Sequence, residues 1–256
     1  MKVEVSFCKQ LLTQDLFHWK KEKKNLHRKK KCFKSKRSRA KKMSQGNEHQ
    51  NKVIVLFDGY SEVINDSKML ANCTCTLVKG KNTCTIVDTR TAWDGKQIVD
   101  ELPKHGLSTD DITHVVCTHG HSDHVGCNYL FLNAKEHIVG RGISNKNEYR
   151  SIEDETNYPI DDGIYITPTP GHTLDSISLI VENSDLSSKP VAICGDLYEK
   201  REDCFHELIW VGAGSDSIDI QKKNRLRIAE MAGVIVPGHG PKFEVTAEIL
   251  AKLKEQ

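Results

Sequence analysis

Three imidazoles and one carboxylate are packed into residues 118–124, whose sequence is THGHSDH. The side chains in this run that commonly bind metal ions are His119, His121, Asp123 and His124. Zinc accepts both imidazole nitrogen and carboxylate oxygen, and a catalytic zinc keeps one coordination position open for water. A single histidine in a loop is usually a surface residue, but four ligating side chains at this spacing indicate a metal site.

A short buried strand is expected directly before this run. Residues 112–117, with the sequence ITHVVC, are rich in β-branched side chains. Gly120 and the Ser122-Asp123 pair are turn formers, and a helix-like segment is expected to begin near Asn128. Open α/β sheets place their ligand sites at the carboxyl ends of strands, so this junction is a suitable position for a metal site.

Three further ligand candidates follow apolar segments in the same way. The extended segment 165–170 ends in Gly171-His172, the strand 190–194 ends in Gly195-Asp196, and the strand 233–236 leads to Gly238-His239. A glycine beside each ligand lets the backbone approach closely or adopt an unusual φ angle. Each pair alone is a weak signal, but four strand ends that each carry a His or Asp form a constellation that chance seldom produces.

The motifs HxHxDH, GH, GD and PGHGP, in this order, resemble those of the metallo-β-lactamase superfamily, and the resemblance runs from about Val53 to the C-terminus. It implies an α/β fold, a four-layer αββα sandwich with two metals at one edge between the sheets. Carried onto this chain, the resemblance implies that the first metal is bound by His119, His121 and His172. It implies that the second metal is bound by Asp123, His124 and His239, with Asp196 bridging the pair.

A two-metal centre of this kind is suited to hydrolysis. Two metals roughly 3.5–4 Å apart can share a hydroxide and stabilise both the attacking and the leaving oxygen. A metal-bound water is acidified to a pKa of about 7, so the nucleophile exists at neutral pH. We expect the bridging hydroxide to be the nucleophile and Asp123 to orient it as a catalytic residue. Two Zn²⁺ ions are the expected cofactors, and the same ligands also suit manganese and iron.

Within the superfamily, the chain resembles a glyoxalase II-like branch of animal proteins. The similarity rests on VIVLFDGY at residues 53–60 and on the segments THGHSDHVGCNYLF, TPGHTLDSISLIV, ICGDLYE and VPGHGPKF. Members of this branch are described as homodimeric endoribonucleases that act on the 3′ end of histone pre-mRNA, in cytosol and nucleus. The resemblance therefore implies single-stranded RNA as a partner and a homodimer. Many superfamily members have Asp-Thr-Gly where this chain has Asp88-Thr89-Arg90, so Asp88 is interpreted as a structural loop anchor.

Two other functions stay open. The compact fold and the acidic body favour a small-molecule hydrolase of thioesters, esters or lactams, of the glyoxalase II type. A mononuclear iron persulfide dioxygenase uses a similar frame in which only the first site is filled. Metal analysis separates these classes, because the dioxygenase holds one iron per chain and the hydrolases hold two zinc ions. A non-enzymatic binding module is the least supported reading, because all seven ligands are present.

The charge of the chain is divided sharply between two regions. Residues 1–52 contain 17 Lys and Arg against 4 Asp and Glu, whereas residues 53–256 contain 20 against 31. Like charges at this density repel one another and bury little, so residues 1–52 are predicted to be a basic, disordered extension. Residues 53–256 are predicted to form the metallo-β-lactamase domain. The extension is interpreted as a nuclear-import signal, a polyanion-binding arm or a solvated segment without a function.

The sequence favours a reducing compartment and no membrane. Residues 1–19 contain two acidic residues and lack the sustained apolar core of a signal peptide. No apolar run approaches the roughly 20 residues that are needed to cross a bilayer. The nine cysteines are scattered and form no CxxC motif, which favours the cytosol or the nucleus. Three of them flank the ligand loops, and we expect buried thiols rather than ligands at Cys117, Cys127 and Cys194.

The remaining patterns predict elements and assign ordinary roles to other polar residues. A hairpin is predicted for residues 74–78 and 83–87, and helices are predicted for residues 95–102, 218–231 and 247–253. Four basic residues are candidates for an RNA groove, although a solvated helix face explains them more simply: Lys222, Lys223, Arg225 and Arg227. Four histidines are interpreted as ordinary residues: His105, His114, His137 and His206.

Overall fold

The computed structural model describes residues 49–65, 67–154 and 156–256. The basic extension predicted for residues 1–52 therefore lies outside the described residues, except for its last four. Strand β1 begins at Lys52, and Asn51 already packs with the domain, because its Nδ2 donates to the carbonyls of Asp162 and Glu182. The division at residue 52, with disorder before it, stays a prediction.

Runs of strands are separated by single helices or pairs of helices along the chain. The first half contains β1 (Lys52–Phe57), β2 (Tyr60–Asn65), β3 (Lys68–Asn72), β4 (Cys75–Lys79), β5 (Cys84–Val87), α2 (Gly95–Glu101), β6 (His114–Cys117), α3 (Ser122–Val125), β7 (Glu136–Val139), β8 (Gly142–Asn145) and β9 (Glu148–Ser151). The second half contains β10 (Tyr158–Asp161), β11 (Ile164–Pro168), β12 (Ile177–Val181), β13 (Val191–Gly195), α4 (Leu208–Ala213), α5 (Ile218–Met231), β14 (Val234–Pro237), β15 (Phe243–Glu244) and α6 (Ala247–Glu255).

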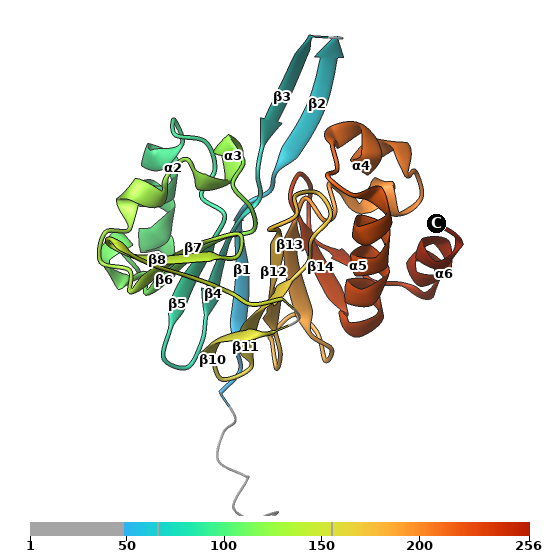
Figure 1. Ribbon diagram of the computed structural model, residues 1–256. Coiled ribbons are helices and arrows are strands. Elements are labelled where there is room, and N and C mark those ends of the chain that lie inside the picture. Colours follow the sequence, from blue (N-terminus) through green and yellow to red (C-terminus); the bar gives the residue numbers. More distant parts are fainter. Residues whose placement is uncertain (1–48, 66, 155) are drawn as a thin grey trace, which may run out of the picture. The chain divides into compact units, whose positions relative to one another are not determined.

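Two large sheets form the centre of this domain (Figure 1). The first has seven strands in the order β1-β4-β5-β6-β7-β8-β9, and the second has six in the order β10-β11-β12-β13-β14-β15. Helix α2 covers the outer face of the first sheet, and α5 and α6 cover the outer face of the second (Figure 1). The predicted four-layer αββα sandwich is confirmed. None of the helices in the described ranges is long and apolar enough to cross a membrane.

Neighbouring residues of the central strands enter different layers of the core. In β6, Val116 packs between the two sheets, while Val115 packs beneath α2 in a cluster with Ile98. In β14, Val236 lies between the sheets and Ile235 packs on the side of α5 and α6. Because side chains alternate across a strand, a strand that is covered on both faces needs an unbroken apolar run. This double burial explains why the strands that deliver the ligands appear as short apolar runs in the sequence.

The predicted hairpin and helices are present in the structure. Strands β4 and β5 pair in antiparallel fashion, with Leu77 opposite Ile86, and the three predicted helices correspond to α2, α5 and α6. The helix-like segment expected near Asn128 is only a single 3-10 turn, Asn128–Leu130, which follows the short helix α3.

A two-stranded hairpin that the sequence analysis did not predict is formed by β2 and β3. It projects beyond the sandwich (Figure 1) and exposes apolar side chains, with Val63 74% and Met69 52% exposed. At its base, Tyr60 pairs with Asn72. These two residues reach the site described below.

Candidate metal centre

Four strand ends deliver the seven predicted ligands to one place. Strand β6 leads into the loop with His119 and His121 and into α3, which carries Asp123 and His124. The loop after β11 carries His172, and β13 and β14 end just before Asp196 and His239. Gly195, with φ of +52°, and Gly238 make the turns that present the last two ligands. A Cβ on Gly238 would overlap the carboxylate of Asp196, so the close approach of these two loops requires a glycine.

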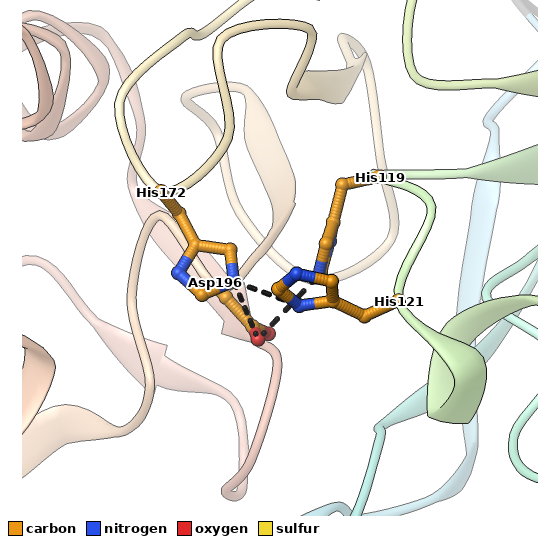
Figure 2. A group of neighbouring side chains, drawn as sticks. All are labelled: His119, His121, His172 and Asp196. Carbon is orange, nitrogen blue, oxygen red and sulfur yellow. Dashed lines mark hydrogen bonds and ion pairs between the residues drawn. The ribbon is translucent and has the colours of Figure 1, made fainter. Parts of the chain in front are cut away.

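The first group of side chains contains His119, His121, His172 and Asp196, whose donor atoms all lie within 4.8 Å of one another. Figure 2 shows the four side chains pointing toward one another. His172 Nε2 is 3.1 Å from His121 Nδ1 and 3.4 Å from Asp196 Oδ2. His119 Nε2 is 3.7 Å from the same oxygen. Donors that bind one zinc ion at about 2.0–2.2 Å lie at similar separations from one another.

The second group contains Asp123, His124 and His239 and satisfies the same limit of 4.8 Å. Asp123 Oδ2 lies 3.9 Å from His124 Nε2 and 3.7 Å from His239 Nε2. Asp196 reaches this group as well, because its Oδ1 is 3.2 Å from His124 Nε2 and its Oδ2 is 3.2 Å from His239 Nε2. The structure thus brings all seven predicted residues together, with Asp196 between the two groups.

Several atoms in the cluster are buried and have no hydrogen-bond partner among the described residues. They are His119 Nε2, His124 Nε2 and Asp196 Oδ1. A buried polar group left in this state costs about 1–3 kcal/mol, and the cost is larger for a charged group. Each of these atoms points toward the others, and each is a donor that zinc accepts. The residues therefore fit metal ions, and the cluster could hold them in two adjacent positions.

Imidazole and carboxylate groups strongly perturb one another in this cluster. Burial alone would raise the pKa of Asp196, but His124, His239 and His119 hold that pKa well below its usual value. Burial lowers the pKa of His119 and of His172. For His239, the attraction of Asp196 outweighs burial and raises the pKa to about 9. Protons and metal ions compete for such sites, because ligands bind metals in their deprotonated forms.

Contacts on the far side of the imidazole rings orient His172 and His239. His172 Nδ1 donates to the Gly214 carbonyl at 2.8 Å. His239 Nδ1 lies 3.2 Å from the Tyr60 carbonyl and 3.1 Å from the Asn72 carbonyl, both at the base of the β2–β3 hairpin. A proton held at Nδ1 leaves Nε2 free to face the cluster, which is how such contacts fix the tautomer of a metal ligand.

Asp88 supports a ligand in addition to anchoring its loop. Its Oδ1 accepts the backbone N–H of Thr118 at 2.7 Å, which agrees with the predicted anchor role. Its Oδ2 also lies 3.0 Å from His124 Nδ1. Asp88 itself has a positive φ of 55°, so the backbone is turned sharply at this point. The carboxylate therefore orients His124 as the carbonyls orient His172 and His239.

Glu199 is a member of the cluster that the sequence analysis missed. Its carboxylate forms a third group of possible metal donors with Asp196 and His239, again within 4.8 Å. The residue is only 2% exposed, and burial followed by the nearby Asp196 raises its pKa to about 8. In the sequence, Glu199 stands three residues after Asp196. This spacing matches no known ligand motif, so its place in the cluster could not be predicted from the sequence.

The residues that were assigned ordinary roles lie outside these groups. His114 is buried and its Nδ1 lies 2.9 Å from Thr113 Oγ1, as expected for a core histidine. No described metal-donor group includes His105, His137 or His206. The three cysteines beside the ligand loops are free and buried, as predicted: Cys117, Cys127 and Cys194.

The interpretation of the basic residues of α5 was wrong for Arg225. This side chain does not lie on a solvated face but is fully buried, with a bidentate pair to Asp203. Lys223 and Arg227 are exposed, while Lys222 is half-buried and pairs with Glu207. Arg225 therefore has a structural role and is unavailable for binding RNA.

Comparison with known proteins gives the family to which this fold and this site belong. The sequence profile described as Metallo-beta-lactamase superfamily matches residues 70–150, which include the THGHSDH run. The chain belongs to the metallo-beta-lactamase superfamily. The animal relatives expected from the sequence are also found: Metallo-beta-lactamase domain-containing protein 1 of Xenopus laevis is 36% identical over 197 residues, which cover 75% of this chain and 81% of that protein. Membership supports the predicted class, a metal-dependent hydrolase.

Two proteins whose descriptions mention acyl homoserine compounds are also similar to this chain. N-acyl homoserine lactonase of Bacillus sp is 27% identical over 135 residues, which cover 47% of this chain and 52% of that protein. A variant of AiiA from Bacillus thuringiensis, with N-decanoyl-L-homoserine bound at its active site, matches with a TM-score of 0.56 and 19% identity. That match covers 74% of this chain and 92% of the AiiA chain, and at this identity it shows the fold alone.

Proposed function

We propose that this chain is a dinuclear metal-dependent endoribonuclease that cleaves phosphodiester bonds of single-stranded RNA, with the 3′ end of histone pre-mRNA as substrate. The observation that carries the proposal is that Asp196 joins two donor groups, since its carboxylate lies 3.2–3.7 Å from four imidazoles. When bound, a metal pair would supply an acidified water and stabilise charge on both the attacking and the leaving oxygen, as in many nucleases.

The chain's own residues support substrate entry from one side of the cluster. His121 is exposed and the Asp123 side chain is 20% exposed, whereas the other five predicted ligands are buried. A scissile phosphate can therefore reach the cluster beside His121 and Asp123. In this arrangement the Asp123 carboxylate accepts a hydrogen bond from the attacking water and orients it, which is the role expected from the sequence.

The test is cleavage of end-labelled single-stranded RNA, including a histone pre-mRNA 3′ segment, by enzyme loaded with zinc or manganese. Asp123→Ala and His172→Ala should abolish defined cleavage, because each removes a donor from a different group. His105→Ala is the matched control, since His105 pairs only with Glu101 among the described residues and lies outside the cluster. Intact RNA in the presence of a fully metallated enzyme would refute the nuclease proposal.

A small-molecule hydrolase of thioesters, esters or lactams, of the glyoxalase II type, is the second candidate. The similarity to N-acyl homoserine lactonase favours this class, with lactones among the substrates to test. Turnover of acyl lactones or thioesters, together with intact RNA under the same conditions, would select this candidate.

Metal content tests the third candidate, a mononuclear iron persulfide dioxygenase. That enzyme would hold one iron per chain in the first group, whereas either hydrolase would hold two ions. Three further features belong to the proposal through the resemblance: a homodimer, single-stranded RNA as a partner, and a location in cytosol and nucleus. Light scattering of the purified chain and imaging of the tagged chain would test the dimer and the location.

A further inference from the structure

Glu199 is held in place from both sides of its backbone. Its N–H donates to Asp203 Oδ2 at 2.7 Å, and its carbonyl accepts the backbone N–H of His239 at 2.8 Å. The turn after β13 is closed by the N–H of Tyr198, which donates to the Gly195 carbonyl at 3.2 Å. The position of Glu199 relative to His239 is therefore fixed by the loop and does not depend on its side chain.

The side chain of Glu199 is almost fully enclosed by the protein, with 3% of its surface exposed. Among the described residues, the basic group that lies near it is His239, with 4.0 Å between Oε2 and Nε2. An ionised carboxylate cannot stay buried without compensation from a cation or from hydrogen bonds. A metal ion that faces Asp196 and His239 would also compensate the charge of an ionised Glu199.

The distance between Glu199 and His239 is compatible with binding to a single ion. Two donors bound at about 2.1 Å lie at most about 4.2 Å apart, when they are on opposite sides of the ion. The Glu199–His239 separation of 4.0 Å is within this limit. The donor atoms of Asp196, Glu199 and His239 all lie within 4.8 Å of one another.

We propose that Glu199 is an additional carboxylate donor to the second metal position. The two positions then differ in chemistry. The first has three imidazoles and the shared Asp196, whereas the second has two imidazoles and three carboxylates. Carboxylate oxygen suits manganese, while imidazole suits zinc and iron. The second position therefore accepts Mn²⁺ more readily than the first, and Glu199 enlarges a difference to which Asp123 already contributes. This inference rests on the proposed metal centre.

The test compares metal binding by Glu199→Gln and by the wild-type chain. Gln has nearly the same shape but lacks the charge, and the backbone bonds of residue 199 are retained. Glu202→Gln is the matched control, because Glu202 is exposed and lies in the same loop. Zn²⁺ and Mn²⁺ are titrated into metal-free protein in separate experiments by calorimetry, and the visible spectrum of bound Co²⁺ reports the number of donors. Circular dichroism confirms the fold of each variant.

We expect Glu199→Gln to weaken the second binding event by at least about 10-fold and to leave the first event unchanged, since the loss of even an outer-shell partner of a metal ligand usually costs about 10–100-fold in metal affinity. The loss should be greater for Mn²⁺ than for Zn²⁺, and the Co²⁺ spectrum should change. Glu202→Gln should match the wild type. Two events of wild-type affinity and an unchanged Co²⁺ spectrum in Glu199→Gln would overturn the inference.

Glu199→Asp provides a second test of the ligand role, which can be used if the Gln variant does not fold. It keeps the carboxylate on a side chain one methylene shorter, so it should retain two binding events with a weakened second one. An Asp variant with wild-type affinity for both ions would show that the length and reach of residue 199 do not matter, and would contradict a ligand role. A wild-type chain that binds no metal would refute the proposed function itself, which is a distinguishable result.

Discussion

The buried ion pair between Arg225 and Asp203 supports the loop that carries Asp196, and its removal should destabilise the domain. The guanidinium makes two contacts to the carboxylate, at 2.7 and 3.2 Å, and donates to the Leu197 carbonyl at 2.8 Å. It also lies over the rings of Tyr198 and Trp210, at 4.2 and 5.0 Å from their centroids. The pair therefore connects α5 to the segment between β13 and α4.

The size of the loss in unfolding free energy follows from the burial of both Arg225 and Asp203. Arg225 and Asp203 are fully buried, with side chains at most 1% exposed. Asp203→Asn removes the negative charge and leaves the guanidinium buried without a counter-charge, which costs about 3–5 kcal/mol of unfolding free energy. A domain of this size loses about 2–4 °C in Tm per kcal/mol, so Tm should fall by about 6–20 °C.

The assay is urea unfolding of the metal-free protein, so that metal binding does not contribute. Asp100→Asn is the control, because Asp100 pairs with Lys96 on the surface and should cost less than about 1 kcal/mol. In a double-mutant cycle with Arg225→Met, the double variant should be more stable than the sum of the single effects predicts, by about 1–3 kcal/mol. A loss below 1 kcal/mol for Asp203→Asn would refute the assigned role of the pair.

Three more predictions concern the close packing of the loops, metal binding and pH. Gly238→Ala should destabilise the domain by about 1–3 kcal/mol and lower its metal content, because the added Cβ meets the Asp196 carboxylate. The control is Gly212→Ala in α4, where a Cβ has no neighbour within 4 Å, so this change should stabilise the domain by about 0.5–1 kcal/mol. Urea unfolding and metal analysis compare the two variants. A chelator that removes the metal should lower the unfolding free energy by about 2.7 kcal/mol for each ion whose free concentration was 100 times its Kd. Calorimetric unfolding can measure this loss, and an unchanged Tm would contradict metal binding to the folded chain. Burial would raise the pKa of Asp161, but hydrogen bonds, first from the backbone N–H of Asn82, lower it from 3.8 to about 2. The stabilisation by the ionised Asp161 is therefore present above pH 4 and is lost as the pH falls toward 2. The difference in unfolding free energy between the metal-free wild type and Asp161→Asn should become smaller over that range, and a constant difference would refute the assignment.

The sequence predicted the parts of the site that depend on strand ends. His172, Asp196 and His239 each follow an apolar run, and a parallel or mixed sheet brings such ends to one edge. Because both faces of these strands are covered, the runs were continuous and easy to locate. The ligand assignments of the individual residues came from the family motifs, and metal-binding experiments are still needed to test them.

Other parts depend on contacts that no local pattern encodes. Arg225 looked like a solvated residue of α5, but Asp203, which neutralises it, lies in a different segment. Glu199 enters the cluster only because the turn after β13 brings its backbone beside His239. The β2–β3 hairpin was missed because its strands are mostly exposed, so they lack the apolar runs that marked the other strands.

The spread of the ligands along the chain determines the order in which a newly made polypeptide can complete the centre. His119 to His124 emerge first from the ribosome, and His239 follows 115 residues later, which corresponds to roughly 6–23 s at 5–20 residues per second. At the start of that interval the THGHSDH run is exposed without the other ligands, and metal that binds an unfolded chain adds less to the stability of the folded one. The second position closes only when β14 pairs with β13. Metal that is added after synthesis therefore meets both groups of ligands complete, whereas metal that is present during synthesis first meets the THGHSDH run alone.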